Sequence, residues 1–261
     1  DAAAAGGGGS GGGAEVGGLT VWAGCLDGSV RRYDVGEGTW TQRGAHVRAA
    51  SAVLDIAVLP ESNLLACALA DGSVSIHACD SGALLSDTWR PLAFDGSQGY
   101  RGARARAVAF VPAADGRHCV VVGGSDGAMH ARYLRAEEEE GRTTEVDVYS
   151  PDRPTGQQLL PSHGGACVAL AALGSGATAG LFVSGAHDGT LRVWDLVGTL
   201  ETGDTGPVCL YGLAGYKVWL GSVCCDGERL ISDGRDNCVL VHDFSSESVA
   251  ERRDPGQPSR E

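Results

Sequence analysis

The chain has 261 residues, with 33 acidic and 20 basic side chains and a formal net charge of −13 at pH 7. This acidic balance argues against a general binder of nucleic acids or anionic membranes, because both would be repelled over the Debye length. No apolar run approaches the roughly 18 residues of a membrane-spanning helix.

A segment rich in glycine and alanine precedes the first predicted strand. Residues 1–18 are predicted to be a disordered linker, because they cannot bury apolar surface. Five later segments each read as an apolar strand, an Asp-Gly or Asp-Asn turn and an alternating strand, which is the pattern of a β-hairpin. They are residues 19–35, 64–79, 119–134, 181–196 and 229–244.

The turn aspartates of these hairpins recur at spacings of 44, 55, 62 and 48 residues, and they are Asp27, Asp71, Asp126, Asp188 and Asp236. A base period of about 40–45 residues is typical of four-stranded propeller blades. Small apolar runs at 51–59, 105–111, 166–173 and 218–224 lie between the hairpins. They are predicted to be innermost strands that are packed on both faces by neighbouring blades.

The segment at 181–196 (LFVSGAHDGTLRVWDL), preceded by Ser162 and His163, resembles a repeat of the WD-repeat (transducin-like) family. The resemblance implies an all-β fold, a β-propeller of four-stranded antiparallel blades. It also implies one buried hydrogen-bonded network within the blade, made by His163, Ser184, Asp188 and Trp194. The other repeats are degenerate, and at the Trp position they carry Tyr33, His77, Arg132 and His242.

About five blades are expected within residues 19–250. The family usually closes a ring of seven, and no strand is predicted before the first hairpin, so the blades are expected to be part of a seven-bladed ring. A closed five-bladed ring is the alternative. The acidic insertion at 135–158 is expected to be a loop that is either functional or disordered, with disorder favoured, and residues 251–261 are expected to be a disordered tail.

No catalytic, metal or cofactor site is predicted. His163, Ser184 and Asp188 have the residue types of a catalytic triad, but the family resemblance assigns them to the structural network, and no nucleophile elbow accompanies them. The seven histidines are scattered, and the nine cysteines show no Cys-x-x-Cys spacing. The odd cysteine count favours a reducing location, and we therefore expect an intracellular protein, cytoplasmic or nuclear.

Candidate partner-binding residues lie before the turn aspartates or near the starts of the inner strands. In WD-repeat proteins partners commonly bind this face, and a Trp beside an Arg is the composition of interface hot spots. The candidates are Leu26, Ser125, His187, Arg235, Asp55 and Trp219, although Trp219 has packing between blades as its alternative role.

These observations predict a non-enzymatic scaffold that binds partner proteins or peptides on the propeller face. The alternative is the substrate-recognition subunit of a ubiquitin ligase, with an F-box-type recruiting module upstream. A third hypothesis is a small-molecule binder or enzyme with its site in the central channel. The nearly uniform Ala, Val, Leu and Gly content of the inner strands, where Asp55 is almost the only charge, argues against this third hypothesis.

Overall fold

The computed structural model of the chain describes a set of segments that together hold nineteen strands. The described residues are 2–5, 19–36, 39–86, 88–91, 102–113, 117–139, 142–149, 157–159, 161–174, 178–196, 207–216, 220–233 and 238–244. Among them is the 3-10 turn η1 (Pro60–Ser62).

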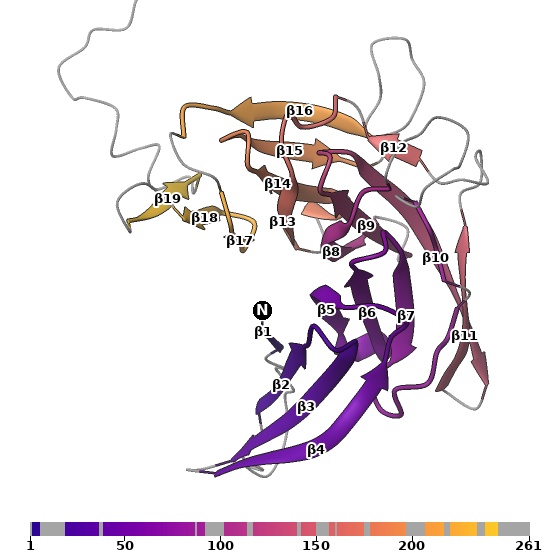
Figure 1. Cartoon of the computed structure of the whole chain (residues 1–261). Helices are drawn as coiled ribbons and strands as arrows, with labels where there is room; N and C mark the ends of the chain where they lie inside the picture. Colours follow the sequence, from indigo (N-terminus) through magenta and orange to yellow (C-terminus); the bar gives the residue numbers. More distant parts are fainter. Residues whose placement is uncertain are drawn as a thin grey trace, which may run out of the picture.

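Five antiparallel sheets follow one another in chain order along an arc (Figure 1), and we number them sheet 1 to sheet 5. Sheet 1 contains β1 (Ala2–Ala5), β2 (Leu19–Gly24), β3 (Ser29–Gly36) and β4 (Thr39–Arg48). Sheet 2 contains β5 (Val53–Leu59), β6 (Leu64–Leu69) and β7 (Val74–Ala78).

The last three sheets contain the remaining strands. Sheet 3 contains β8 (Ala105–Pro112), β9 (His118–Gly124), β10 (Met129–Glu139), β11 (Arg142–Tyr149) and β12 (Gln157–Leu159). Sheet 4 contains β13 (Cys167–Ala172), β14 (Leu181–Ala186), β15 (Leu191–Asp195) and β16 (Val208–Leu213). Sheet 5 contains β17 (Val223–Cys225), β18 (Arg229–Asp233) and β19 (Val239–Asp243).

All five predicted hairpins are present, as the pairs β2–β3, β6–β7, β9–β10, β14–β15 and β18–β19. The predicted inner strands are β5, β8, β13 and the shorter β17, each of which begins its sheet. Adjacent inner strands contact one another in series, β1 with β5, β5 with β8, β8 with β13 and β13 with β17. The sheets therefore stand side by side with their first strands inward, which is a radial arrangement.

Each internal sheet contributes its two faces to two different cores. Along β6 every residue is buried, and Leu65 and Cys67 pack in the core shared with sheet 1. Leu64 and Ala66 on the opposite face pack in the core shared with sheet 3. Since successive side chains of a strand point to opposite faces, a strand buried on both sides has an uninterrupted apolar sequence.

Three expectations are corrected by the strands. Residues 2–5 form β1, paired with β2 at the inner position where no strand was predicted, because the edge of β2 offers unpaired backbone groups to an extended segment. Residues 6–18 and 251–261 lie outside the described residues. Within the predicted loop at 135–158, the described residues instead extend β10 to Glu139, form β11 and begin β12, because Thr143, Val146, Val148 and Tyr149 favour a strand. The inner strand expected at 218–224 is described as a strand only over Val223–Cys225.

Membership of these five sheets in a ring of seven stays a prediction. Among the described residues, no helix has the length and apolarity needed to cross a bilayer.

Candidate functional site

Four turn aspartates are described, and they share one geometry. In each turn the carboxylate Oδ1 accepts the backbone N–H of the residue two positions later, at distances of 2.9 to 3.1 Å. The intervening glycine has a positive φ, between 72° and 85°. The four pairs are Asp27 with Ser29, Asp71 with Ser73, Asp126 with Ala128 and Asp188 with Thr190, whereas Asp236 lies outside the described residues.

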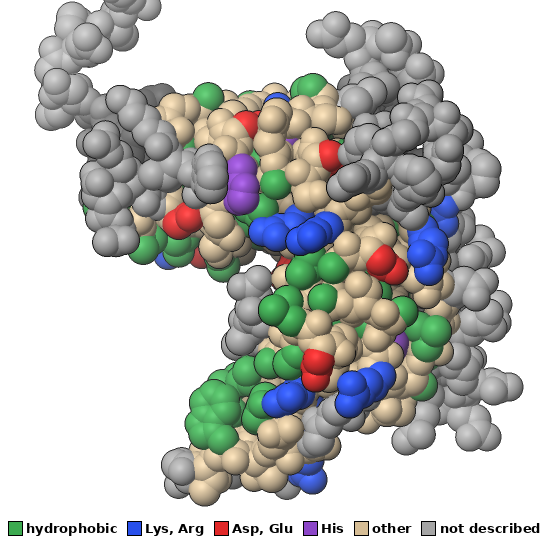
Figure 2. Space-filling view, in the orientation of Figure 1, with side chains coloured by type: hydrophobic (Ala, Val, Ile, Leu, Met, Phe, Trp, Pro, Cys, Tyr) green, Lys and Arg blue, Asp and Glu red, His purple; other side chains and the backbone are tan. Residues whose placement is uncertain are grey.

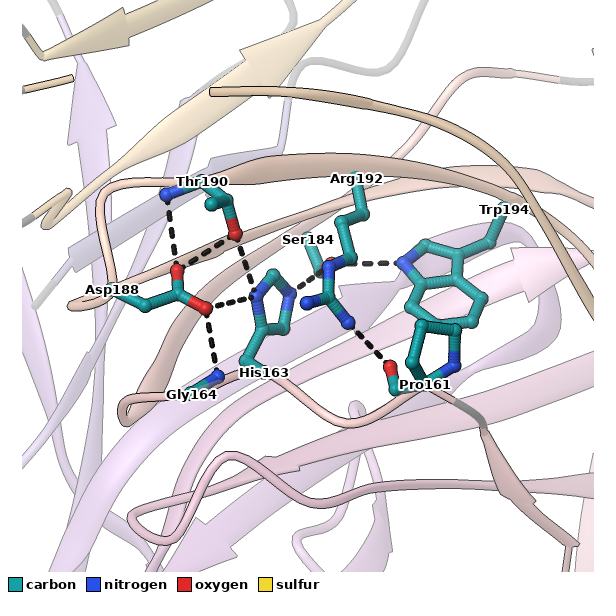
Figure 3. Close-up of polar contacts among 8 residues, drawn as sticks. All are labelled: Pro161, His163, Gly164, Ser184, Asp188, Thr190, Arg192 and Trp194. Atoms are coloured by element: carbon teal, nitrogen blue, oxygen red, sulfur yellow. Dashed lines mark hydrogen bonds and ion pairs between the residues drawn. The ribbon is translucent and has the colours of Figure 1, made fainter. Parts of the chain in front are cut away.

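Sheet 4 holds a continuous chain of hydrogen bonds through His163 (Figure 3). The imidazole Nε2 lies 2.7 Å from Ser184 Oγ, and that hydroxyl accepts the indole N–H of Trp194 at 2.9 Å. On the other side of the ring, Nδ1 lies 3.1 Å from Thr190 Oγ1 and 3.3 Å from Asp188 Oδ2. The four residues that the family resemblance assigned to one network are thus brought together, with Thr190 as a fifth member.

The two ends of this chain fix the direction of its protons. An indole N–H only donates and a carboxylate only accepts, so His163 Nδ1–H donates toward Asp188 and Nε2 accepts the Ser184 hydroxyl. Burial lowers the pKa of His163, and the charge of Arg192 lowers it further against the opposing effect of Asp188, which favours a neutral imidazole. Burial by itself disfavours the charged carboxylate of Asp188, but hydrogen bonds from Thr190 and Gly164 outweigh it and lower the pKa of Asp188.

The loop that carries His163 is fixed between two turns. His163 N–H donates to the carbonyl of Gly127 in the turn of sheet 3 at 3.0 Å, and Gly164 N–H donates to Asp188 Oδ2 in the turn of sheet 4 at 2.8 Å. Arg192 also donates to the carbonyl of Pro161. The network therefore joins two neighbouring sheets as well as strands within one sheet.

The other sheets replace this network by smaller polar contacts. In sheet 2, His77 is buried at the Trp position, and its Nε2 lies 3.0 Å from Ser75 Oγ. In sheet 5, His242 Nε2 lies 2.6 Å from the hydroxyl of Tyr216. In sheet 3 the guanidinium of Arg132 lies 5.3 Å from the ring centroid of Trp89, a cation–π distance.

The triad-like residues of sheet 4 are closed off from substrate. Ser184 is 0% exposed, and its oxygen already contacts Trp194 and His163. A serine nucleophile needs its oxygen to reach a carbonyl carbon, and this oxygen has no open side. Within the described residues there is also no group of three His, Cys, Asp or Glu side chains placed to hold a metal ion.

The partner-binding candidates occupy different environments. Leu26 is 78% exposed, Ser125 is exposed and His187 is half-buried, each directly before a turn aspartate. Trp219 and Arg235 lie outside the described residues. The structure therefore does not bring these two together with the others.

Asp55 is a contact between sheets. It lies on β5, and its Oδ2 accepts the backbone N–H of Val108 on β8 at 2.8 Å. Burial raises the pKa of Asp55 to about 6, against the lowering effect of this hydrogen bond. The carboxylate thus joins the inner strands of sheets 2 and 3.

Two residues that contribute to the His163 network were not predicted from the sequence. Thr190 bonds both Asp188 and His163, and its signal was a hydroxyl residue two positions after three of the turn aspartates (Ser29, Ser73 and Thr190). The contact of Gly127 with His163 had no local signal, because the two residues belong to different repeats.

Radially arranged antiparallel sheets, joined by their inner strands and, in the four described turns, closed by a hydrogen-bonded aspartate, define a protein of the β-propeller class. A model of the WD domain, G-beta repeat, matches residues 156–195, which contain the whole His163 network. The curated proteins contain no sequence that matches the chain. The chain thus contains one WD-type repeat, and its all-β sheets are consistent with the WD-repeat family, whose domains generally serve as protein-interaction scaffolds.

Proposed function

We propose that the chain is a non-enzymatic scaffold that binds partner proteins or peptides on the face formed by the turn loops and the starts of the inner strands. One observation carries the proposal. In the triad-like constellation of the matched repeat, Ser184 and His163 are buried, and both are hydrogen-bonded within the repeat. Its polar groups serve the architecture, so recognition is left to exposed residues.

The exposed residues of this face support the same proposal. Leu26 and Ser125 are exposed and His187 is half-buried, and all three lie in turns whose backbones are fixed by the aspartate bonds described above. Variable side chains on a rigid framework are the usual construction of a protein-binding surface. We extend the proposal to a reducing location inside the cell, since Cys67, Cys119 and Cys167 are buried thiols packed as small apolar side chains.

Affinity purification of the tagged full-length chain, followed by mass spectrometry, tests this function. The variant Leu26→Asp places a charge on the proposed face, and Leu84→Asp is its matched control, an exposed leucine (57%) that forms a bridge with His77 at the outer side of sheet 2. We expect Leu26→Asp to lose partners that Leu84→Asp retains. The Trp219→Ala, Arg235→Ala double variant tests the candidates outside the described residues.

Two outcomes would contradict the proposal. If all variants recover the same partners as the wild type, the proposed face is not the binding site. If the purified chain turns over a substrate, the non-enzymatic assignment is wrong. Recovery of ubiquitin-transfer proteins, lost only in the face variants, would identify the scaffold as a ligase subunit.

A further inference from the structure

Three consecutive inner strands share one irregularity at their second residue. The pairing register shifts between Val53 and Asp55 in β5, between Ala105 and Ala107 in β8, and between Cys167 and Ala169 in β13. Each shift leaves one extra residue, and the three are Leu54, Arg106 and Val168. All three are half-buried, although the residue before each is buried. Such β-bulges redirect a side chain out of the regular pleat.

Two arginines lie together at the bulge of sheet 3. Arg106 is the bulge residue, and Arg104 directly precedes β8 and is exposed. The backbone of Arg104 is fixed by two bonds to Ser125, whose N–H donates to the Arg104 carbonyl at 2.9 Å and whose Oγ accepts the Arg104 N–H at 3.0 Å. Both guanidinium groups are therefore attached to ordered backbone.

Within the described part of the chain, neither guanidinium has a hydrogen bond or an ion pair, whereas Arg43 and Arg229 pair with Asp34 and Asp243. The carboxylates of the neighbouring turn and inner strand already accept backbone hydrogen bonds. Asp126 accepts the N–H of Ala128, and Asp55 accepts that of Val108. Within the described residues, these two cations therefore have no partner, in a chain whose net charge is −13.

The surroundings of this pair are mixed rather than uniformly charged. Figure 2 shows basic side chains gathered over the start of β8, next to apolar side chains over β5. Leu54, the bulge residue of β5, is half-buried on the strand adjacent to Arg106. Unpaired guanidinium groups beside apolar surface match carboxylates interspersed with apolar residues, because an Arg side chain can bond a carboxylate through two parallel N–H groups.

We propose that Arg104 and Arg106 bind an acidic segment of a partner protein, rich in Glu or Asp and containing apolar residues. This inference rests on the proposed scaffold function and names the chemistry of its partner. Ser125 acts as a positioning residue that holds the backbone of Arg104.

Fluorescence anisotropy with the full chain tests the proposal. The probe is a short labelled peptide that alternates glutamate with leucine and alanine, and its control has glutamine in place of every glutamate. We expect the chain to bind the glutamate peptide and not the glutamine peptide. Since charge-assisted bonds to two guanidinium groups are lost, Arg104→Ala, Arg106→Ala should weaken binding about tenfold or more.

The matched control is Arg43→Ala, Arg229→Ala, which makes the same change in net charge at two exposed ion pairs elsewhere. It should bind the glutamate peptide as the wild type does. Equal weakening by both double variants, equal binding of both peptides, or binding of only a phosphoserine peptide or a single-stranded RNA would overturn the inference. If the double variant does not fold, Arg104→Ala alone decides, because its side chain is exposed and unpaired within the described residues. If the inference fails while Leu26→Asp still loses partners, the scaffold function stands without it.

Discussion

The indole N–H of Trp194 donates to the hydroxyl of Ser184 over 2.9 Å. Because Ser184 also contacts His163, this bond connects Trp194 to the buried hydrogen-bonded network. Ser184 is both acceptor and donor here, so its removal orphans two buried partners at once. We expect Ser184→Ala to lower the free energy of unfolding by about 1–3 kcal/mol.

A double-mutant cycle with Trp194→Phe measures the coupling between these two residues. The double variant should be less destabilised than the sum of the single variants, because the indole N–H left unpaired by Ser184→Ala is then absent. Urea denaturation of the four proteins provides the measurement. Strict additivity would contradict the hydrogen bond.

Gly127 and Gly215 differ in what a side chain would meet. Both have a positive φ, +85° and +104°, but a Cβ on Gly127 would clash with the carbonyl oxygen of His163, whereas nothing lies within 4 Å of a Cβ on Gly215. We expect Gly215→Ala to cost about 1–3 kcal/mol, the strain of the backbone conformation alone. Gly127→Ala should cost clearly more, because it also separates sheet 3 from the loop of sheet 4. Equal melting temperatures for the two variants would show that this contact is absent.

The titration of His163 predicts a loss of stability in acid. Burial lowers its pKa in the folded chain below the ordinary value of 6.5, so the unfolded chain binds the proton first as the pH falls. The stabilising contribution is therefore complete above about pH 6.5 and is lost progressively below it. The melting temperature should fall on acidification, and less steeply in His163→Gln. A residual slope is expected, because burial also lowers the pKa values of His118 and His130.

Asp55 gives the opposite dependence on pH. Burial raises its pKa from 3.8 to about 6, so its contribution to stability is complete below pH 3.8 and is lost as the pH rises through 6. Asp55→Asn keeps an oxygen that can accept the Val108 N–H and removes the charge. We therefore expect the variant to gain stability relative to the wild type as the pH rises from 4 to 7, with a plateau above. A constant difference across this range would contradict the burial of the charge.

The sequence was sufficient for the hairpins because each is encoded locally, by an Asp-Gly or Asp-Asn turn between alternating strands. It was insufficient where an element depends on a neighbour. β1 forms on the free edge of β2, and β11 forms against β10, although residues 2–5 read as linker and 142–149 as loop. The His163 network followed from the family resemblance, whereas Arg104 and Arg106 were missed because a β-bulge is a property of strand pairing and has no local sequence signal.

The serial contact of the inner strands has a consequence for how the molecule opens. A sheet that is packed on both faces by neighbouring sheets opens less readily than one whose strands are partly exposed. β8 and β9 are buried along almost their whole length, whereas β18 alternates between buried and exposed residues. Amide hydrogen exchange should therefore be slowest in sheet 3 and grow faster toward sheet 5, a gradient of protection along the arc.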